Sequence, residues 1–165
     1  MFKLNHTLTT LAVSLGFLVF LPPVLAASRY TVSANGQEVK DNKTQLVWRR
    51  CSEGMSWSVN ACVGSASNLT HQAALQQAAK VATNTGVAWR LPNVKELASI
   101  VDRSRSNPAI DTLVFPATPS NAFWSSSPYV GYSGYAWVVY FDGGSVYGSG
   151  DRYGSLPVRL VRASQ

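Results

Sequence analysis

The stretch WRLPNVKELASIV, residues 89–101, joins an extended segment to the start of a helix. Trp89–Pro92 is predicted to be an extended link. Asn93 and Glu96 then form a pair similar to a capping box, in which the Asn side chain accepts from the third helical N–H and the Glu side chain accepts from the N–H of the capping residue. The helix is predicted over residues 93–104. Its apolar stripe consists of Val94, Leu97, Ala98 and Val101, with Ile100 widening it.

Another helix is predicted before it, over residues 70–85. Thr70 is a candidate N-cap, because its hydroxyl can accept from a free N–H of the first turn. Gly86 suits the C-terminal end, where the backbone often becomes left-handed. The apolar positions at i, i+3, i+4 and i+7 are Leu75, Ala78, Ala79 and Ala82. Two helices are therefore expected in the middle of the chain.

Strands are predicted on both sides of the helices. Residues 136–141 (AWVVYF) are apolar on both faces, which predicts a central strand covered on both sides. Residues 142–144 form a turn, and residues 145–147 should return antiparallel. A strand at 45–50 is expected to pair with one at 157–163, which brings the ends of the domain together. Helices between terminal strands, followed by a small antiparallel sheet, make one α+β domain.

The N-terminus has the pattern of a secretory signal peptide over residues 1–26. Lys3 provides the positive start, residues 8–21 are apolar without a charge, and small residues precede an expected cut after Ala26. The mature chain would be a single domain, residues 27–165. This predicts a location in the bacterial periplasm, on the cell surface or in the medium.

Cys51 and Cys62 are the only two cysteines. In an exported protein they are predicted to form a disulfide, since the C-x-x-C spacing of a redox pair is absent. Closing so short a loop contributes about 2–3 kcal/mol in the chain-entropy model. Trp57, which lies among Ser and Asn inside this loop, is predicted to be the exposed tryptophan. The tryptophans predicted to lie in the core are Trp48, Trp89, Trp124 and Trp137.

The net charge is +6, from 14 basic and 8 acidic residues. Lys3 is the one charged residue before position 27, so +5 remains on the mature chain. Only Arg49 and Arg50 are adjacent, whereas a nucleic-acid-binding stripe would cluster its charges on one element. Nucleic acid is therefore excluded as a partner, and any membrane contact is expected to be peripheral. The net positive charge is compatible with binding to a polyanion such as an acidic glycan, or it serves solubility alone.

Several motifs occur together in an order that resembles one bacterial family, the C-terminal domain of the Legionella collagen-like adhesin. The resemblance runs from about Val47 to Arg162. It implies a C-type-lectin-like fold, in which the terminal strands pair, two helices pack beneath, and long loops present a variable face. It also implies binding rather than catalysis. The motifs are Val47-Trp48-Arg49-Arg50-Cys51, Trp89 to Leu97, Phe123-Trp124-Ser125-Ser126-Ser127, Ala136-Trp137 and Val158-Arg159-Leu160-Val161-Arg162.

Calcium-dependent lectins of this fold carry Glu-Pro-Asn or Gln-Pro-Asp and Trp-Asn-Asp motifs, and none of these occurs here. Leu91-Pro92-Asn93 lacks the preceding carboxylate or amide, and Asn93 is better explained as a helix cap. We therefore expect binding without calcium, with no metal and no cofactor.

Residues 129–155 resemble the variable segment of lectin-like proteins that diversity-generating retroelements target. Tyr buries a large area at a low cost in rotamer entropy, while Ser and Gly adapt, as in antibody loops. This segment is predicted to bind a glycan or a cell-surface protein, and the sequence does not predict the oligomeric state. The predicted ligand-binding residues are Tyr129, Tyr132, Tyr135, Tyr147, Asp151, Arg152 and Tyr153.

An exported hydrolase is the alternative function. His71 is the only histidine after the leader and is predicted to be solvated in the first turn of its helix. Ser125–Ser127 lack the Gly-x-Ser-x-Gly elbow of a serine hydrolase. Asp142 and Asp151 are a candidate carboxylate pair, but a turn and an exposed loop explain them better. No catalytic residue is therefore predicted.

Overall fold

The computed structural model describes residue 1 and residues 28–164. The predicted signal peptide, 1–26, and the predicted new N-terminus, Ala27, lie outside the described residues except for Met1. No helix in the described part of the chain is long and apolar enough to cross a membrane. The elements are β1 Tyr30–Val32, β2 Glu38–Asp41, β3 Leu46–Arg49, β4 Ser56–Ser58, β5 Ala61–Val63, α1 His71–Thr85, α2 Val94–Ser99, β6 Ala122–Pro128, β7 Tyr135–Tyr140, β8 Val146–Asp151 and β9 Val161–Ala163.

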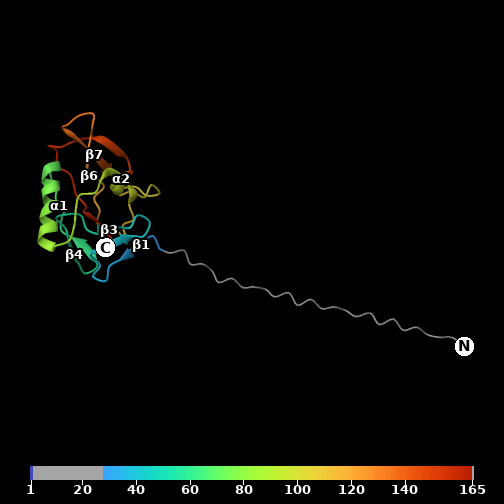
Figure 1. Cartoon of the computed structure of the whole chain (residues 1–165). Coiled ribbons are helices and arrows are strands. Elements are labelled where there is room, and N and C mark those ends of the chain that lie inside the picture. The colour runs from blue at the N-terminus through green and yellow to red at the C-terminus, as the bar shows by residue number, and fades with distance from the viewer. Residues whose placement is uncertain (2–27, 165) are drawn as a thin grey trace.

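The two ends of the domain meet in one antiparallel sheet of order β1-β2-β3-β9. Leu46 pairs with Ala163 and Trp48 with Val161, which confirms the predicted pairing of the terminal segments. Figure 1 shows the C-terminus beside β1 and β3, at the opposite end of the domain from β6 and β7. Arg90 forms a bridge with Val161, so the extended link before α2 also contacts this sheet.

Strand β2 was not predicted, because it lies in a polar stretch with a single apolar residue. Val39 and Asp41 are nevertheless both fully buried. They alternate with half-buried Glu38 and Lys40, the period expected of a strand with one covered face. The sequence does not indicate this alternation, because Asp at position 41 is typical of a turn rather than of a buried strand position.

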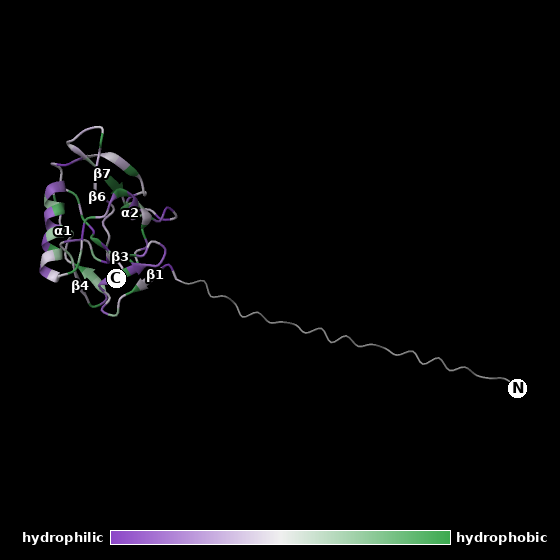
Figure 2. Cartoon of the chain, viewed as in Figure 1, coloured by the Kyte–Doolittle hydropathy of each residue, from purple (hydrophilic) through white to green (hydrophobic). Residues whose placement is uncertain are grey.

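Helix α1 begins and ends as predicted. The Thr70 hydroxyl accepts a hydrogen bond from the Ala73 N–H at 3.3 Å. Gly86 closes the helix with φ of 66°, in the left-handed region. The buried residues of α1 are His71, Ala74 and Ala78, so the predicted apolar stripe was partly wrong, since Leu75 and Ala79 are exposed. Hydrophilic and hydrophobic residues alternate along the ribbon of α1 in Figure 2, as expected of a helix that covers the core with one side.

Helix α2 starts as predicted but is shorter. The Asn93 side chain accepts from the Glu96 N–H at 2.9 Å, and the Glu96 carboxylate accepts from the Asn93 N–H at 2.8 Å. The helix ends at Ser99 rather than near residue 104. The chain leaves the helical path because the Asp102 N–H donates to Ala109 O at 2.9 Å, a contact with the following loop.

The second major sheet has the order β6-β7-β8, with β7 in the centre as predicted. Its two faces pack into different cores: Val138 belongs to the cluster that contains the buried residues of α1, and Val139 to the cluster that contains Leu97 of α2. The predicted double cover of this strand is therefore confirmed. The run Phe123–Ser127, for which no strand was predicted, forms most of β6. Its serines conceal the strand pattern.

The predicted disulfide between Cys51 and Cys62 is present, and a small β4-β5 hairpin lies in its loop. Trp57 on β4 is half-buried rather than exposed. The Arg50 guanidinium carbon lies 4.3 Å from the centre of its ring, so a cation–π contact covers one side of it. Arg50 itself is buried and donates to Leu113 O and Val114 O at 2.8 Å. The adjacent arginines therefore do not form a surface patch.

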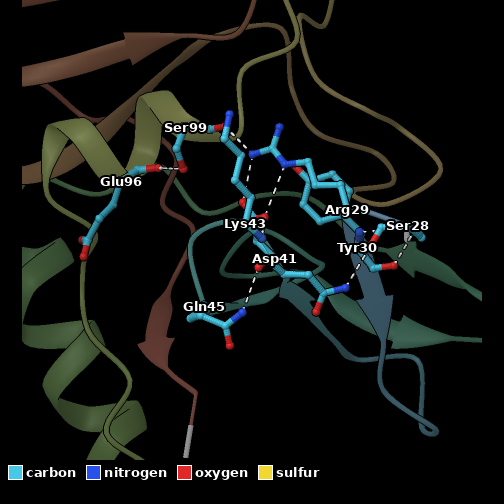
Figure 3. A network of polar contacts seen from close by, with 9 residues as sticks. Ser28, Arg29, Tyr30, Asp41, Lys43, Gln45, Glu96 and Ser99 are labelled. Carbon is cyan, nitrogen blue, oxygen red and sulfur yellow. Dashed lines mark hydrogen bonds and ion pairs between the residues drawn. The ribbon is translucent and has the colours of Figure 1, made fainter. Parts of the chain in front are cut away.

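A polar network connects residues 28–30 to α2 (Figure 3). Arg29 donates to the Asp41 carboxylate at 2.8 and 3.3 Å, and also to Ser99 O at 2.6 Å. Burial opposes ionisation of Asp41, but the bonds from Arg29 and the Lys43 N–H outweigh it and hold the pKa of this carboxyl below its usual range. The network joins the terminal sheet to the end of the helix.

Candidate ligand-binding face

The connection between β6 and β7 is an ordered loop, residues 129–134. The Tyr129 N–H donates to Tyr135 O at 3.1 Å, and the Tyr135 N–H donates to Tyr132 O at 3.0 Å. The Arg152 N–H donates to Gly134 O at 2.9 Å, which ties the loop to the residue after β8. Backbone hydrogen bonds therefore hold the tyrosines of this loop on a fixed frame.

Both neighbours of β7 bulge at the level of Trp137. On one side Ala136 pairs with Gly150 and Val138 with Tyr147, so β8 has one extra residue opposite Trp137. On the other side the register with β6 also shifts between Ala136 and Val138. Within that shift, the Ser125 hydroxyl donates to Trp137 O at 2.7 Å. β-Bulges change the direction in which neighbouring side chains point, and they are frequent beside functional sites.

The bulges border a groove of about 430 Å³, which we name the aromatic groove. The Tyr129 and Trp137 rings meet edge to face, with centroids 5.7 Å apart. A Cβ at Gly131 or Gly148 would come within 2.6 or 2.4 Å of the Tyr129 ring, so both glycines allow the ring to lie directly on the backbone. The groove is lined by Tyr129, Tyr135, Trp137, Val146, Tyr147, Gly148 and Ser149.

The groove stays open because α2 covers only one end of this face. Tyr135, Trp137 and Val139 alternate along β7 and therefore lie on one face of the sheet. Val139 is fully buried in the cluster around α2, whereas Tyr135 and Trp137 are half-buried. The uncovered end of this face, at Tyr135 and Trp137, is therefore the part that lines the groove.

Tyr147 reaches the groove from the strand edge, but its ring lies toward the other face. It pairs in register with Val138, and directly paired residues point to the same side of a sheet. Its ring packs edge to face on Tyr140, with centroids 5.5 Å apart. Tyr147 remains 53% exposed, so it is available to a ligand at this edge.

A second hollow of about 320 Å³ lies against the start of α1, and we name it the α1 pocket. The Arg152 guanidinium in this pocket donates to Ser133 O at 3.2 Å and to His71 Nδ1 at 3.1 Å. Arg152 therefore already supports the loop and the helix, in addition to facing the pocket. The pocket is lined by Thr70, Gln72, Leu75, Ser133, Gly134, Arg152 and Tyr153.

The prediction that His71 is solvated was wrong, since only 1% of it is exposed. Its ring packs edge to face on Trp124, and Nε2 lies 3.0 Å from Ser125 O. With Nε2 donating to that carbonyl, Nδ1 accepts from Arg152, which requires the neutral ring. Burial lowers the pKa of His71, and the charge of Arg152 lowers it further, against the hydrogen bond to Ser125 O. His71 thus connects α1, β6 and the loop after β8.

Five of the seven predicted ligand-binding residues fall into two groups that share one end of the domain, and Tyr132 and Asp151 line neither hollow. Tyr129, Tyr135 and Tyr147 line the aromatic groove, while Arg152 and Tyr153 line the α1 pocket. Tyr132 is 60% exposed and packs on Tyr135 at 4.8 Å between ring centroids. Asp151 is exposed opposite Tyr135 in the sheet, and its carboxylate accepts from the Tyr153 N–H at 3.0 Å.

Sequence reasoning missed the role of Trp137, which was predicted to be a core residue. Its spacing of two from Tyr135 places both on one strand face, and that signal was available in the sequence. The pockets also contain residues that were not named as binding residues. Five of them lie inside the predicted binding segment 129–155, namely Ser133, Gly134, Val146, Gly148 and Ser149. No sequence pattern linked the other three, Thr70, Gln72 and Leu75, to a binding site.

The groups considered for hydrolysis do not form a catalytic arrangement. His71 meets Ser125 through the backbone carbonyl, while the Ser125 hydroxyl donates to Trp137 O. Asp142 is exposed in its turn and accepts from the Gly143 N–H. Among the described residues, no three His, Cys, Asp or Glu side chains gather as a possible metal site.

Comparison with known proteins identifies one family. The family described as the Lcl C-terminal domain matches residues 37–162. No significant match is found among curated proteins or among solved structures.

Proposed function

This chain belongs to the Lcl C-terminal domain family, and we propose that it is an exported binding module with a C-type-lectin-like fold. Membership confirms the resemblance seen in the sequence motifs. The family is associated with an adhesin, which favours attachment to external surface molecules over catalysis. The paired terminal strands, the two helices and the loop-rich opposite end support the lectin-like assignment.

The observation that carries this proposal is the pair of hollows at one end of the domain. Tyr135 and Tyr147 extend into the aromatic groove from β7 and β8, and Tyr129 and Tyr153 line the hollows from the adjoining loops, with Arg152 in the α1 pocket. Aromatic rings with one polar end and a fixed support are efficient contacts, because little side-chain entropy is lost on binding. We propose that a glycan or a cell-surface protein binds here without calcium, through the seven residues named from the sequence.

Export and processing belong to the same proposal. Residues 1–26 would act as a signal peptide, and the mature chain would be residues 27–165, in the periplasm, on the surface or in the medium. N-terminal sequencing of the exported protein should begin at Ala27. A chain that retains residues 1–26 after export would contradict this step.

A finer proposal is that residues 129–155 form the variable segment of a retroelement target. The exposed side chains of Tyr132, Tyr147 and Tyr153 project from backbone that hydrogen bonds hold in place. Substitution there would alter the ligand without altering the core. Closely related gene copies that differ mainly within this segment would support the idea, and differences spread evenly along the chain would contradict it.

The test is a binding screen of residues 27–165 against arrayed glycans and host-cell surface proteins, with and without a chelator. Tyr147→Ala combined with Tyr153→Ala removes one exposed ring at each hollow, and we expect weaker binding from a folded protein. Leu113→Ala is the matched control, because Leu113 is 81% exposed outside both hollows. Unchanged binding by the folded double variant would place the site elsewhere.

The same screen addresses the hydrolase alternative. An enzyme depends on one or two polar groups, so Asp142→Asn would abolish its turnover, whereas a binding face spreads its energy over several anchors. We expect capture of a ligand without its conversion. Turnover of an arrayed glycan or an ester, lost in a folded Asp142→Asn variant, would favour the enzyme.

A further inference from the structure

We propose that the aromatic groove binds an uncharged sugar ring and that Arg152 takes no direct part in this contact. The inference rests on the proposed binding function and names the ligand class for one of its two hollows.

The first argument is the charge of the lining. None of the seven residues that line the groove carries a charge at neutral pH. Arg152 lines the α1 pocket, which has no lining residue in common with the groove. Its guanidinium already donates to His71 and to Ser133 O. A sulfate or carboxylate in the groove would therefore give up part of its hydration shell without meeting a cation, which disfavours an anionic ligand there.

The second argument is the chemistry of the walls. Trp137 and Tyr129 offer aromatic surface that their mutual contact and the neighbouring glycines hold in place. A pyranose has C–H faces that pack on aromatic rings and hydroxyl groups around its edge. The phenol groups of Tyr129 and Tyr135 and the hydroxyl of Ser149 are neutral donors and acceptors for that edge. The walls thus match both surfaces of a sugar.

The third argument is size. A volume of about 430 Å³ falls within the range of about 300–1,000 Å³ that holds small ligands. A stable protein partner would need about 800 Å² of contact on each side, far more than one short groove provides. The dimensions favour a few sugar units over a folded protein surface.

The experiment compares uncharged oligosaccharides of glucose, galactose, mannose and N-acetylglucosamine with sulfated and uronic-acid-containing oligosaccharides on one array. We expect residues 27–165 to bind an uncharged member, with an affinity that changes little between low and high salt. Tyr135→Ala should weaken this binding about tenfold or more, as for a central aromatic anchor. Leu113→Ala, at a position 81% exposed outside both hollows, should leave it within about twofold.

Folding is checked by thermal melting of each variant. Ser149→Ala provides a second groove variant outside the aromatic packing, and it too should weaken binding if the edge hydroxyl is used. Binding confined to charged oligosaccharides and lost at high salt would overturn the sugar assignment while leaving the binding function intact. Binding only to a host-cell surface protein would do the same. A folded chain that binds nothing on the array or on host surfaces would contradict both proposals.

Discussion

Asp41 keeps a charge where its side chain is closed to solvent, and Arg29 makes this possible. Arg159 is the corresponding buried cation. It is fully buried and donates to the carbonyls of Arg49 and Arg50 and to the Thr118 hydroxyl. Burial lowers the pKa of Arg159 to about 9, which still leaves it charged at neutral pH. Buried charged residues of this kind connect segments that are distant in the sequence. The residue type alone does not predict that such a side chain is buried.

Arg29→Ala should lower the free energy of unfolding, because the buried Asp41 carboxylate would lose two hydrogen bonds. Leaving a buried polar group unpaired costs about 1–3 kcal/mol. The lower part of that range applies, since 37% of the Arg29 side chain is exposed and water can replace it. Urea unfolding at neutral pH measures the change. Lys80→Ala, at an exposed position of α1, should change stability by less than about 0.5 kcal/mol. Equal effects of the two changes would contradict the role of the pair.

At the scale of elements, local signals predicted the starts of both helices, the end of α1 and the strongest strand. Thr70, Asn93 and Gly86 act through neighbours within a few residues, so the sequence contains the whole cause. The end of α2 and the existence of β2 and β6 depend on contacts with distant segments. A short strand with one apolar residue, or one with three serines, has no periodicity to detect. The division of the tyrosines between two hollows follows from strand register, which the sequence did not specify.

His71 should make stability depend on pH, because it links three elements only in its neutral form. Its pKa is lowered on folding, so the unfolded state binds a proton more readily. The contribution is complete above the unfolded value of about 6.5 and is lost as the pH falls through it toward the folded pKa. The midpoint temperature of thermal unfolding should therefore decrease as the pH is lowered from 7 to about 5.

His71→Phe keeps a flat ring against Trp124 but cannot titrate, so its thermal midpoint should stay nearly level over the same pH range. It is the only histidine after position 26, which makes the comparison direct. The acidic groups with lowered pKa values, such as Asp41 and Glu96, contribute fully at neutral pH, and their contribution is lost mainly below about pH 5. An identical pH dependence in both proteins would rule out the His71 linkage.

Gly150→Ala should destabilise the sheet of β6, β7 and β8. A Cβ there would lie 2.6 Å from side-chain atoms of Trp124 and Val138 and 2.9 Å from Ala136 O. Overpacking of this kind costs about 1–3 kcal/mol. Gly143→Ala is the matched change in the same hairpin, where an added Cβ meets nothing within 4 Å, and its stability should stay level or rise slightly. Equal shifts of the denaturant midpoint in the Gly150→Ala and Gly143→Ala variants would contradict the expected overpacking at Gly150.

At the scale of the whole molecule, the terminal sheet and the proposed binding face lie at opposite ends (Figure 1). The ends of the described domain meet in the terminal sheet, while the loop 129–134 and the residues after β8 form the other end. The disulfide and the buried Arg159 lie beside the terminal sheet, where both contact the end of β3 and the residues that follow it. A module attached to a surface through its termini would thus present the tyrosines away from that surface.

Hydrogen exchange of residues 27–165, with and without the ligand captured in the screen, tests the central claim most directly. If the binding face is where we propose, added protection should concentrate in residues 129–135 and 146–153. Slow exchange in the terminal sheet should be unchanged, because that end lies away from the ligand. Protection confined to the β4-β5 hairpin around Trp57, or to β1 and β2, would contradict the account.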